Sequence, residues 1–148
     1  GKIVIPGPVY QELSNPSIPH IKRRADALLN NDVASVKQIE TDKAEYNLYR
    51  TLVKGTKTEK AIGKGEAAGI ALTKTYGGIL ASNNWKDIAL YIEKYNLKHI
   101  DTGRILIEGL EKALITEEQG NTVWEQMLNK NRMLPEKSFS DYLKRYTR

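Results

Sequence analysis

The sequence predicts an α/β fold in which a parallel-rich sheet is flanked by helices on both faces. In residues 1–113, short apolar runs alternate with longer helical patterns, which is the order produced by parallel strands with crossover helices. Residues 114–148 contain helical patterns without further strands, and we expect them to form a helical C-terminal extension of the same domain. A chain of 148 residues is long enough for one domain with a core and short for two.

The predicted elements follow one another closely along the chain. They are strand 2–5, helix 8–14, helix 18–30, strand 33–39, helix 42–53, helix 64–76, strand 78–82, helix 85–95, strand 98–101, helix 103–113, helix 117–130 and helix 135–146. Pro8 suits the first turn of its helix, because the missing N–H has no helical partner to lose there. Asp42 is suitable near the start of the helix that contains Tyr46 and Leu52 on its apolar face.

Capping residues justify the boundaries of the later helices. Gly77 can adopt the left-handed conformation that ends the helix before it. Thr116 and Gln119 have the spacing of a capping box at the start of the next-to-last helix. Ser138 or Glu136 can open the last helix.

Composition narrows the class of protein. Hydrophobic residues make up 40% of the chain and charged residues 28%, proportions typical of a soluble globular protein. No apolar run reaches the length of a membrane-spanning helix, so we expect no membrane partner and a cytoplasmic location. Cysteine is absent, which excludes disulfides, thiol catalysis and cysteine-ligated zinc.

The net charge favours an anionic partner. The formal charge is +5 and the sequence pI is about 9.3. Basic residues gather in three places, Lys22-Arg23-Arg24, residues 54–64 and residues 144–148. Nucleic acid is the natural partner for such clusters. The alternative is that these lysine-rich segments are solvated loops and tails.

Acidic and amide side chains are expected to meet at one edge of the sheet. A helix that feeds a parallel strand runs antiparallel to it, so the start of helix 64–76 lies at the carboxyl end of the strand that follows. Glu66 and the Asn83-Asn84 pair should therefore face one crevice. Glu12 lies about one turn into the helix that begins at the carboxyl end of the first strand, near the same edge.

Four segments, in their order along the chain, resemble the landmarks of PIN-domain nucleases. They are Ile3-Val-Ile-Pro6, Val9-Tyr-Gln-Glu-Leu13, Gly63-Lys-Gly-Glu-Ala67 and Gly77-Gly-Ile-Leu-Ala-Ser-Asn-Asn84. Their order and spacing, rather than any single motif, carry the resemblance, which spans about the first two thirds of the chain. The resemblance implies a metal-dependent ribonuclease fold that is common among bacterial and archaeal toxin-antitoxin toxins. It implies RNA as the substrate and an antitoxin-like protein as a partner.

The resemblance also implies roles for individual residues. Glu12 and Glu66 fall on two of the family's acidic positions and would be metal ligands. Asn84 or Asp87 would hold a metal-bound water, and Asp87 is the third expected metal ligand. Oxygen ligands of this kind suit Mg²⁺ or Mn²⁺, which would activate water for phosphodiester hydrolysis. Lys64 would attract the phosphate backbone, as Lys22, Arg23 and Arg24 would.

Two departures from the family pattern affect these expectations. The family's first acidic residue ends an initial central strand, whereas this sequence starts at what resembles the second strand, so we expect a truncated start. An unpaired sheet position would then favour strand exchange or a homo-oligomer, with residues 114–146 as a second contact surface. Asn84 stands where the family usually has an aspartate, and an amide oxygen can reach a metal but carries no charge. We therefore expect the chain to be a poor nuclease.

Other interpretations of the same residues remain open. Glu66 in a first helical turn also complements the helix dipole, and Asn84 is favoured in turns after strands. The same residues therefore also fit a catalytically degenerate PIN-like domain that binds protein or nucleic acid, or a small-molecule-binding α/β domain. Trp85 and Trp124 are expected to pack in the core, and Trp85, next to Asn84, is also suited to stack on a base.

Overall fold

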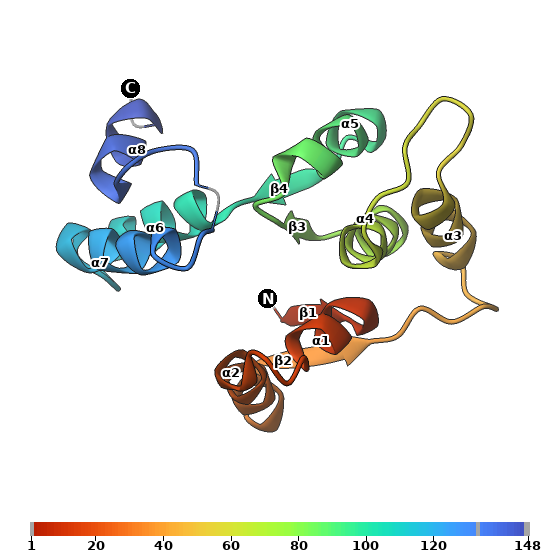
Figure 1. Ribbon diagram of the computed structural model, residues 1–148, viewed down its shortest axis with the longest axis horizontal. Coiled ribbons are helices and arrows are strands. Elements are labelled where there is room, and N and C mark those ends of the chain that lie inside the picture. Colours follow the sequence, from red (N-terminus) through yellow and green to blue (C-terminus); the bar gives the residue numbers. More distant parts are fainter. Residues whose placement is uncertain (1, 133, 147–148) are drawn as a thin grey trace. The chain divides into compact units, whose positions relative to one another are not determined.

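A computed structural model of the chain describes residues 2–132 and 134–146 (Figure 1). Within these residues the chain forms eight helices and four short strands, which confirms the predicted α/β character. The strands pair in parallel, two by two.

The chain divides into two compact units, which are described separately. Unit 1 comprises residues 1–80 and 86–98, and unit 2 comprises residues 81–85 and 99–148. Strands β3 (Ile79–Ala81) and β4 (Lys98–Ile100) pair with each other, and each contains a boundary between the units.

Unit 1 is built around strands β1 and β2 and a central helix. Its elements are β1 (Ile3–Pro6), α1 (Gly7–Leu13), α2 (Pro19–Asn30), β2 (Ala34–Lys37), α3 (Tyr46–Lys54), α4 (Lys64–Tyr76) and α5 (Trp85–Tyr95), of which Trp85 belongs to unit 2. The register pairs Ile3 with Ala34 and Pro6 with Lys37. Two short strands are marginal alone, so α1 and α2 stabilise the pair by packing on it around buried Ile5.

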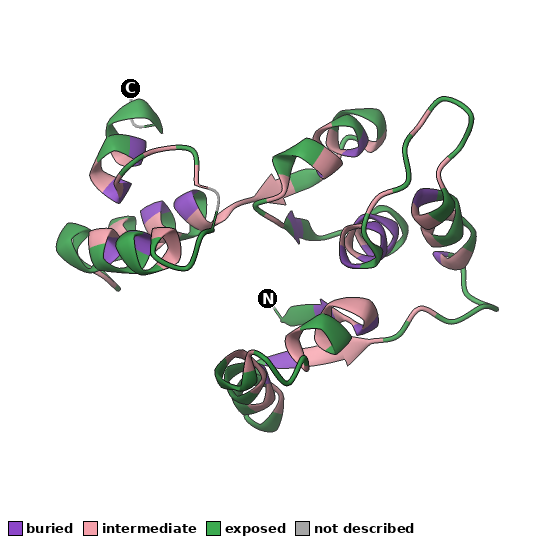
Figure 2. Cartoon of the chain, viewed as in Figure 1, coloured by how far each residue is buried: buried purple, intermediate pink, exposed green. Residues whose placement is uncertain are grey.

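Helix α4 is the best-buried helix of unit 1, as the purple colouring in Figure 2 shows. Its buried residues include Ala67, Ala68 and Ala71, whose small side chains allow α1 and α3 to pack closely against it. Ile70 joins a core cluster with residues of α3, β3 and α5, namely Leu52, Leu80, Ile88 and Tyr91. A helix that is apolar on most sides belongs in an interior, and this position brings the start of α4 beside α1.

Unit 2 has an aromatic core. Its helices are α6 (Thr102–Glu111), α7 (Glu117–Leu128) and α8 (Phe139–Tyr146). Trp124, Phe139 and Tyr142 are fully buried and pack on Ile107. The rings of Tyr142 and Phe139 lie so close to Gly103 and Gly120, respectively, that a Cβ atom on either glycine would collide with them. Glycine is therefore needed at these two positions for room.

The structure differs from the predicted fold in the extent of its sheet. In the described part of the chain the four strands form two separate pairs, where one continuous sheet was expected. Each strand has only three or four residues, so the ladders are short and the packed helices supply most of the burial. Ile3 and Val4 of β1 are about half exposed, and the predicted homo-oligomer stays a prediction.

Two helix starts were also predicted too early. Helix α3 begins at Tyr46, because residues 41–45 form turns that carry the Glu45 side chain into the interior. Helix α8 begins at Phe139, where the Ser138 hydroxyl accepts a hydrogen bond from the Asp141 amide at 3.0 Å. Helix α4 ends at Gly77 as expected, and Gly77 has a positive φ of 78° that favours glycine, but its ψ of −172° lies outside the left-handed helical conformation. The expected capping box of Thr116 is confirmed.

Candidate functional site

The first turn of α4 collects two of the predicted acidic residues. The Glu12 carboxylate oxygens lie 3.2 and 3.4 Å from the position that a Cβ atom would take on Gly65. The Glu66 side chain folds back over Gly63, where a Cβ atom would collide with its Oε2 atom. The backbone of Gly63 has a φ of −57°, which any residue can adopt, so its glycine provides space rather than an unusual conformation. Glu12 and Glu66 thus lie at the same helix end.

Local sequence places Glu12 there. Pro8 lies in the first turn of α1, directly after β1, and the helix packs against α4. Val9 approaches the Gly65 position at 3.2 Å, so Val9 and Glu12, three residues apart, present one face of α1 to the start of α4. Glu12 is exposed, whereas Glu66 is half buried.

Asn84 and Asp87 are positioned by other elements. Asn84 precedes α5, and its backbone N–H donates a hydrogen bond to the Ser82 hydroxyl at 3.1 Å. Asp87 lies in the first turn of α5. Asn84 belongs to unit 2, whereas Asp87, Glu12 and Glu66 belong to unit 1. The roles predicted for Asn84 and Asp87 therefore stay predictions.

Glu12 and Glu66 form an acidic pair that supplies part of the donor set of a metal ion. Carboxylate oxygens are the ligands that Mg²⁺ and Mn²⁺ prefer, so Glu12 and Glu66 fit such an ion in kind. Across residues 2–132 and 134–146, no group of three or more His, Asp or Glu side chains is arranged to hold a metal. The pair would supply fewer charged ligands than the full predicted set.

The predicted basic residues differ in their surroundings. Lys22 pairs with Asp26 at 2.5 Å, and Asp26 also accepts a hydrogen bond from the Tyr10 hydroxyl at 2.7 Å. The hydrogen bond with Asp26 raises the pKa of Lys22, and that with Lys22 lowers the pKa of Asp26. The Lys22 ammonium is therefore already paired with a carboxylate of the same chain, whereas Arg23 and Arg24 are exposed on α2.

The net positive charge of the chain belongs to unit 1. Unit 1 contains 15 lysine and arginine residues against 10 aspartate and glutamate residues, whereas unit 2 contains eight of each. Lys64, exposed in the first turn of α4, lies directly between the two glycines that accommodate Glu66 and Glu12. The unit with the acidic pair is thus also the unit with the basic excess.

A second polar cluster, built from Lys37, Glu45 and Tyr76, did not emerge from the sequence. Glu45 is completely buried, and its Oε2 atom accepts a hydrogen bond from the Tyr76 hydroxyl at 2.7 Å. Its Oε1 atom is buried with no hydrogen-bond partner among the described residues. The Lys37 ammonium lies 4.4 Å from the centre of the Tyr76 ring. The contacts join β2, the residue before α3 and the end of α4, and the Glu45–Tyr76 contact alone spans 31 residues of sequence, which no local pattern reveals.

Asn83, which follows β3, and Asp101, which follows β4, have hydrogen-bond partners within unit 2. The Asn83 side chain donates to the Thr102 hydroxyl and accepts from the Thr102 amide, both at 2.9 Å. Asp101 caps α6 by accepting from the Arg104 amide at 2.8 Å and also accepts from the Tyr142 hydroxyl at 3.0 Å. These bonds fix the start of α6.

The two tryptophans have opposite environments. Trp124 is fully buried, which confirms its predicted role in the core. Trp85 is 57% exposed, so the expectation that it packs in a core is wrong. It begins α5 on the solvent side, with its ring against His99.

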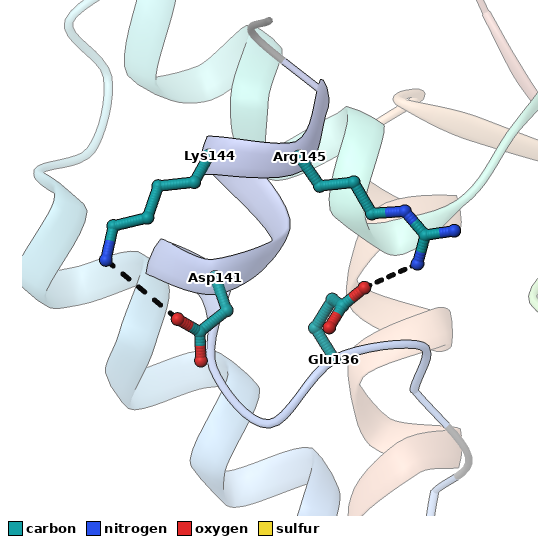
Figure 3. A pocket seen from close by; sticks show the side chains of 4 residues that line it. All are labelled: Glu136, Asp141, Lys144 and Arg145. Carbon is teal, nitrogen blue, oxygen red and sulfur yellow. Dashed lines mark hydrogen bonds and ion pairs between the residues drawn. The ribbon is translucent and has the colours of Figure 1, made fainter.

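A shallow depression on unit 2 is lined by charged residues of α8 and the segment before it (Figure 3). Arg145 pairs with Glu136 at 2.6 Å and Lys144 with Asp141 at 4.0 Å. Each cation faces an anion, so the depression offers no net charge to a ligand.

Comparison of the chain with family models, curated proteins and solved structures finds no match. In residues 2–132 and 134–146, no helix is both long and apolar enough to cross a membrane.

Proposed function

We propose that the chain is a PIN-like ribonuclease-fold domain that acts on RNA, with Glu12 and Glu66 as the acidic site. The observation that carries this proposal is that both side chains lie at the first turn of α4, Glu12 against Gly65 and Glu66 against Gly63. The two segments that supply them, one on α1 and one on α4, are also segments in which the sequence resembles PIN-domain nucleases. An antitoxin-like partner and a cytoplasmic location stay predictions.

The two carboxylates would hold Mg²⁺ or Mn²⁺. Like charges brought to one helix end repel each other, and a cation relieves that repulsion. When bound, such an ion activates water and stabilises charge on the scissile phosphate. Glu12 and Glu66 would position the ion, and Gly63 and Gly65 keep the space in which both side chains lie.

RNA is the substrate class that the charge supports. The excess of five positive charges belongs to unit 1. Arg23, Arg24 and Lys64 are exposed there and would attract the phosphate chain. This attraction is independent of sequence, so binding should weaken steeply as salt is added.

A binding module without cleavage is the second candidate. It is favoured by the small number of charged ligands at the start of α4, because two carboxylates attract a divalent cation less well than four. A glutamate in the first turn of α4 also complements the helix dipole without any metal. In this case the chain would bind RNA and leave it intact.

The experiment compares wild type with Glu66→Gln and Glu118→Gln in Mn²⁺ binding and in cleavage of single-stranded RNA. Glu118 is the matched control because, like Glu66, it lies in the first turn of a helix; this helix is α7 in unit 2, where Glu118 is exposed. We expect slow, Mg²⁺- or Mn²⁺-dependent cleavage that Glu66→Gln abolishes and Glu118→Gln retains, with Mn²⁺ affinity following the same order. Metal-independent cleavage, or equal Mn²⁺ binding by all three proteins, would contradict the proposal. Intact RNA that is nevertheless bound would favour the second candidate.

A further inference from the structure

The basic clusters of the sequence differ in how many of their charges are already paired. In the first cluster, Lys22 is paired with Asp26, and in the last, Lys144 and Arg145 each face a carboxylate. In the described part of the chain, the cations of the middle cluster, residues 54–64, form no ion pair. We extend this cluster by one helical turn and name it the α3–α4 basic surface, which consists of five exposed cations, Arg50, Lys54, Lys57, Lys60 and Lys64.

The loop 55–63 (yellow in Figure 1) closes on itself and brings these cations together in unit 1. It starts at Gly55, whose φ of 71° favours glycine and whose Cβ position would lie only 2.7 Å from the Ala61 nitrogen. Near its other end, the Ile62 backbone N–H donates a hydrogen bond to the Leu52 carbonyl at 3.1 Å. The loop therefore returns to the end of α3, and its lysines are held in a small region.

The one acidic residue of this segment is already neutralised. Residues 50–64 contain five cations and a single carboxylate, that of Glu59. Glu59 is half buried and forms an ion pair with Lys94 of α5 at 2.6 Å. Its carbonyl also accepts a hydrogen bond from the Thr56 backbone N–H at 2.8 Å, which closes the turn within the loop. An excess of four positive charges is thus left to solvent in residues 50–64.

The apolar side chains of the same segment face inward, which indicates the chemistry of the partner. Leu52 is buried in the core of unit 1, and Val53 and Ile62 pack against that core. No large apolar side chain of residues 50–64 is exposed. Protein interfaces are centred on aromatic and apolar residues and are depleted in lysine, whereas a phosphate chain is attracted by positive charge alone. The surface therefore suits a phosphate backbone better than a protein.

We infer that the α3–α4 basic surface binds the phosphate backbone of RNA and leads it to the acidic site. The inference rests on the proposed function and deepens it, because it names the surface along which the substrate lies. Lys64 ends the surface between Gly63 and Gly65, the two glycines that accommodate Glu66 and Glu12. A strand bound along the loop would thus reach the first turn of α4. Contacts to phosphates carry no base sequence, so RNA strands of different sequence should bind alike.

The test measures binding of a fluorescently labelled oligouridylate to the full chain in EDTA, where metal-dependent cleavage is blocked. We compare wild type with Lys57→Gln/Lys60→Gln and with Lys130→Gln/Arg132→Gln. The second pair is the matched control, because both residues are exposed cations of unit 2 and their loss changes the net charge equally. At 0.15 M salt the loop variant should bind about tenfold more weakly, and the control nearly as wild type does.

The salt dependence gives a second readout, which counts the phosphates contacted. Each phosphate of a single strand that is neutralised contributes about −0.7 to the slope of the logarithm of affinity against the logarithm of salt concentration. Five contacts predict a slope of about −3.5 for wild type and for the control, and three contacts predict about −2 for Lys57→Gln/Lys60→Gln. A slope unchanged by the loop substitutions would contradict the inference.

Removing the acidic residue of the loop should have the opposite effect. Glu59→Gln takes away a negative charge and releases the charge of Lys94, so it should tighten binding about fourfold at 0.15 M salt and steepen the slope. Glu118→Gln, which changes the net charge equally but lies in unit 2, should leave the affinity unchanged. Such a gain of affinity cannot come from unfolding. Unchanged or weaker binding by Glu59→Gln would count against the surface.

The outcomes separate the binding surface from nuclease activity. Equal affinities of wild type and Lys57→Gln/Lys60→Gln would overturn the inference while leaving cleavage to be judged by Glu66→Gln. Binding that depends on the loop lysines, in a chain that never cleaves RNA, would support the surface and refute the nuclease. Tighter binding to phosphatidylserine vesicles than to oligouridylate would assign the surface to a membrane and overturn the inference, and so would failure of wild type to bind RNA.

Discussion

In both units of this protein, glycines leave space for a large neighbouring side chain. The neighbours are aromatic rings in unit 2 and carboxylates in unit 1. In unit 2, Gly103 and Gly120 lie under the buried rings of Tyr142 and Phe139. In unit 1, Gly63 and Gly65 lie under the carboxylates of Glu66 and Glu12. The first arrangement fills a core and stabilises it. The second places two acidic side chains at the start of one helix, where Glu66 lies in the first turn of α4 and complements the helix dipole.

The largest expected effect is on the core of unit 2. Gly103→Ala should destabilise the protein by about 2–3 kcal/mol, because its Cβ atom would collide with the Tyr142 ring and that ring is enclosed by Trp124. Denaturant unfolding would show a lowered midpoint. Gly109→Ala is the control in the same helix, where only the flexible Ile115 side chain lies nearby, at 3.3 Å. It should be neutral or stabilise by up to about 1 kcal/mol. Equal midpoints for the two variants would break the comparison.

An intermediate effect is expected at two tyrosine–carboxylate hydrogen bonds, Tyr76–Glu45 in unit 1 and Tyr142–Asp101 in unit 2. In unit 1 the carboxylate, Glu45, is buried and the tyrosine is exposed, whereas in unit 2 the tyrosine is buried and Asp101 is half exposed. Tyr142→Phe should cost about 1 kcal/mol, since Asp101 keeps its bond to the Arg104 amide. Tyr76→Phe should lower the free energy of unfolding by more, because it leaves the buried Glu45 carboxylate without the hydrogen bond from the Tyr76 hydroxyl. A milder effect of Tyr76→Phe in denaturant unfolding would contradict the described burial of Glu45.

The same tyrosines predict how stability depends on alkaline pH. Burial, and then the charge and hydrogen bond of Asp101, raise the pKa of Tyr142 in the folded state. A raised pKa means that the neutral form stabilises the fold fully below the unfolded value of about 10 and that this contribution is lost as the pH rises above it. Thermal unfolding between pH 9 and 12 should therefore show a smaller alkaline loss in Tyr142→Phe than in wild type. An identical loss would assign the effect to other groups.

The smallest effect on stability, and a larger one on metal binding, is expected at Gly65. A Cβ atom there would press on Glu12 and Val9 at 3.2 Å, and the exposed Glu12 side chain can move away. We expect Gly65→Ala to change the unfolding free energy by less than about 1 kcal/mol and to weaken Mn²⁺ binding about tenfold. Mn²⁺ titration followed by electron paramagnetic resonance measures this, with Gly109→Ala as the control. Unchanged affinity in Gly65→Ala would show that Glu12 is not a ligand.

The elements predicted best are those whose ends are set by local chemistry. Helices 64–76 and 85–95 have the predicted bounds, and the capping box of Thr116 was visible from its spacing. The start of α3 was predicted wrongly because Glu45, just before it, is buried and accepts a hydrogen bond from Tyr76. This contact joins residues 31 positions apart, which a local sequence pattern does not show. Pairing of the strands in two sheets was missed for a similar reason, since alternation predicts parallel neighbours without saying which strands meet.

The candidate site was predictable in part. Glu12 and Glu66 were expected at one edge of a continuous sheet, whereas β1 and β3 belong to separate strand pairs and Glu12 lies near the start of α4 because α1 packs on α4. The glycines beside Glu66 indicated open space that its side chain and that of Glu12 occupy. Exposure of Trp85 was not predictable, because an aromatic residue at the start of an amphipathic helix has the same pattern whether it faces a core or water.

The boundary between the units has a consequence for how the protein can be cut. The chain passes from one unit to the other at residues 80–81, 85–86 and 98–99. A single proteolytic cut at any of these points would divide the chain into two fragments, but the chain would still cross between the units at the other two points. At least one fragment would then contain parts of both units, so the fragments should stay associated until denatured. Neither unit is one uninterrupted piece of sequence, and deleting residues 99–148 would also remove the His99 and Ile100 part of β4. Dissection of this protein therefore calls for point variants or circular permutation rather than truncation.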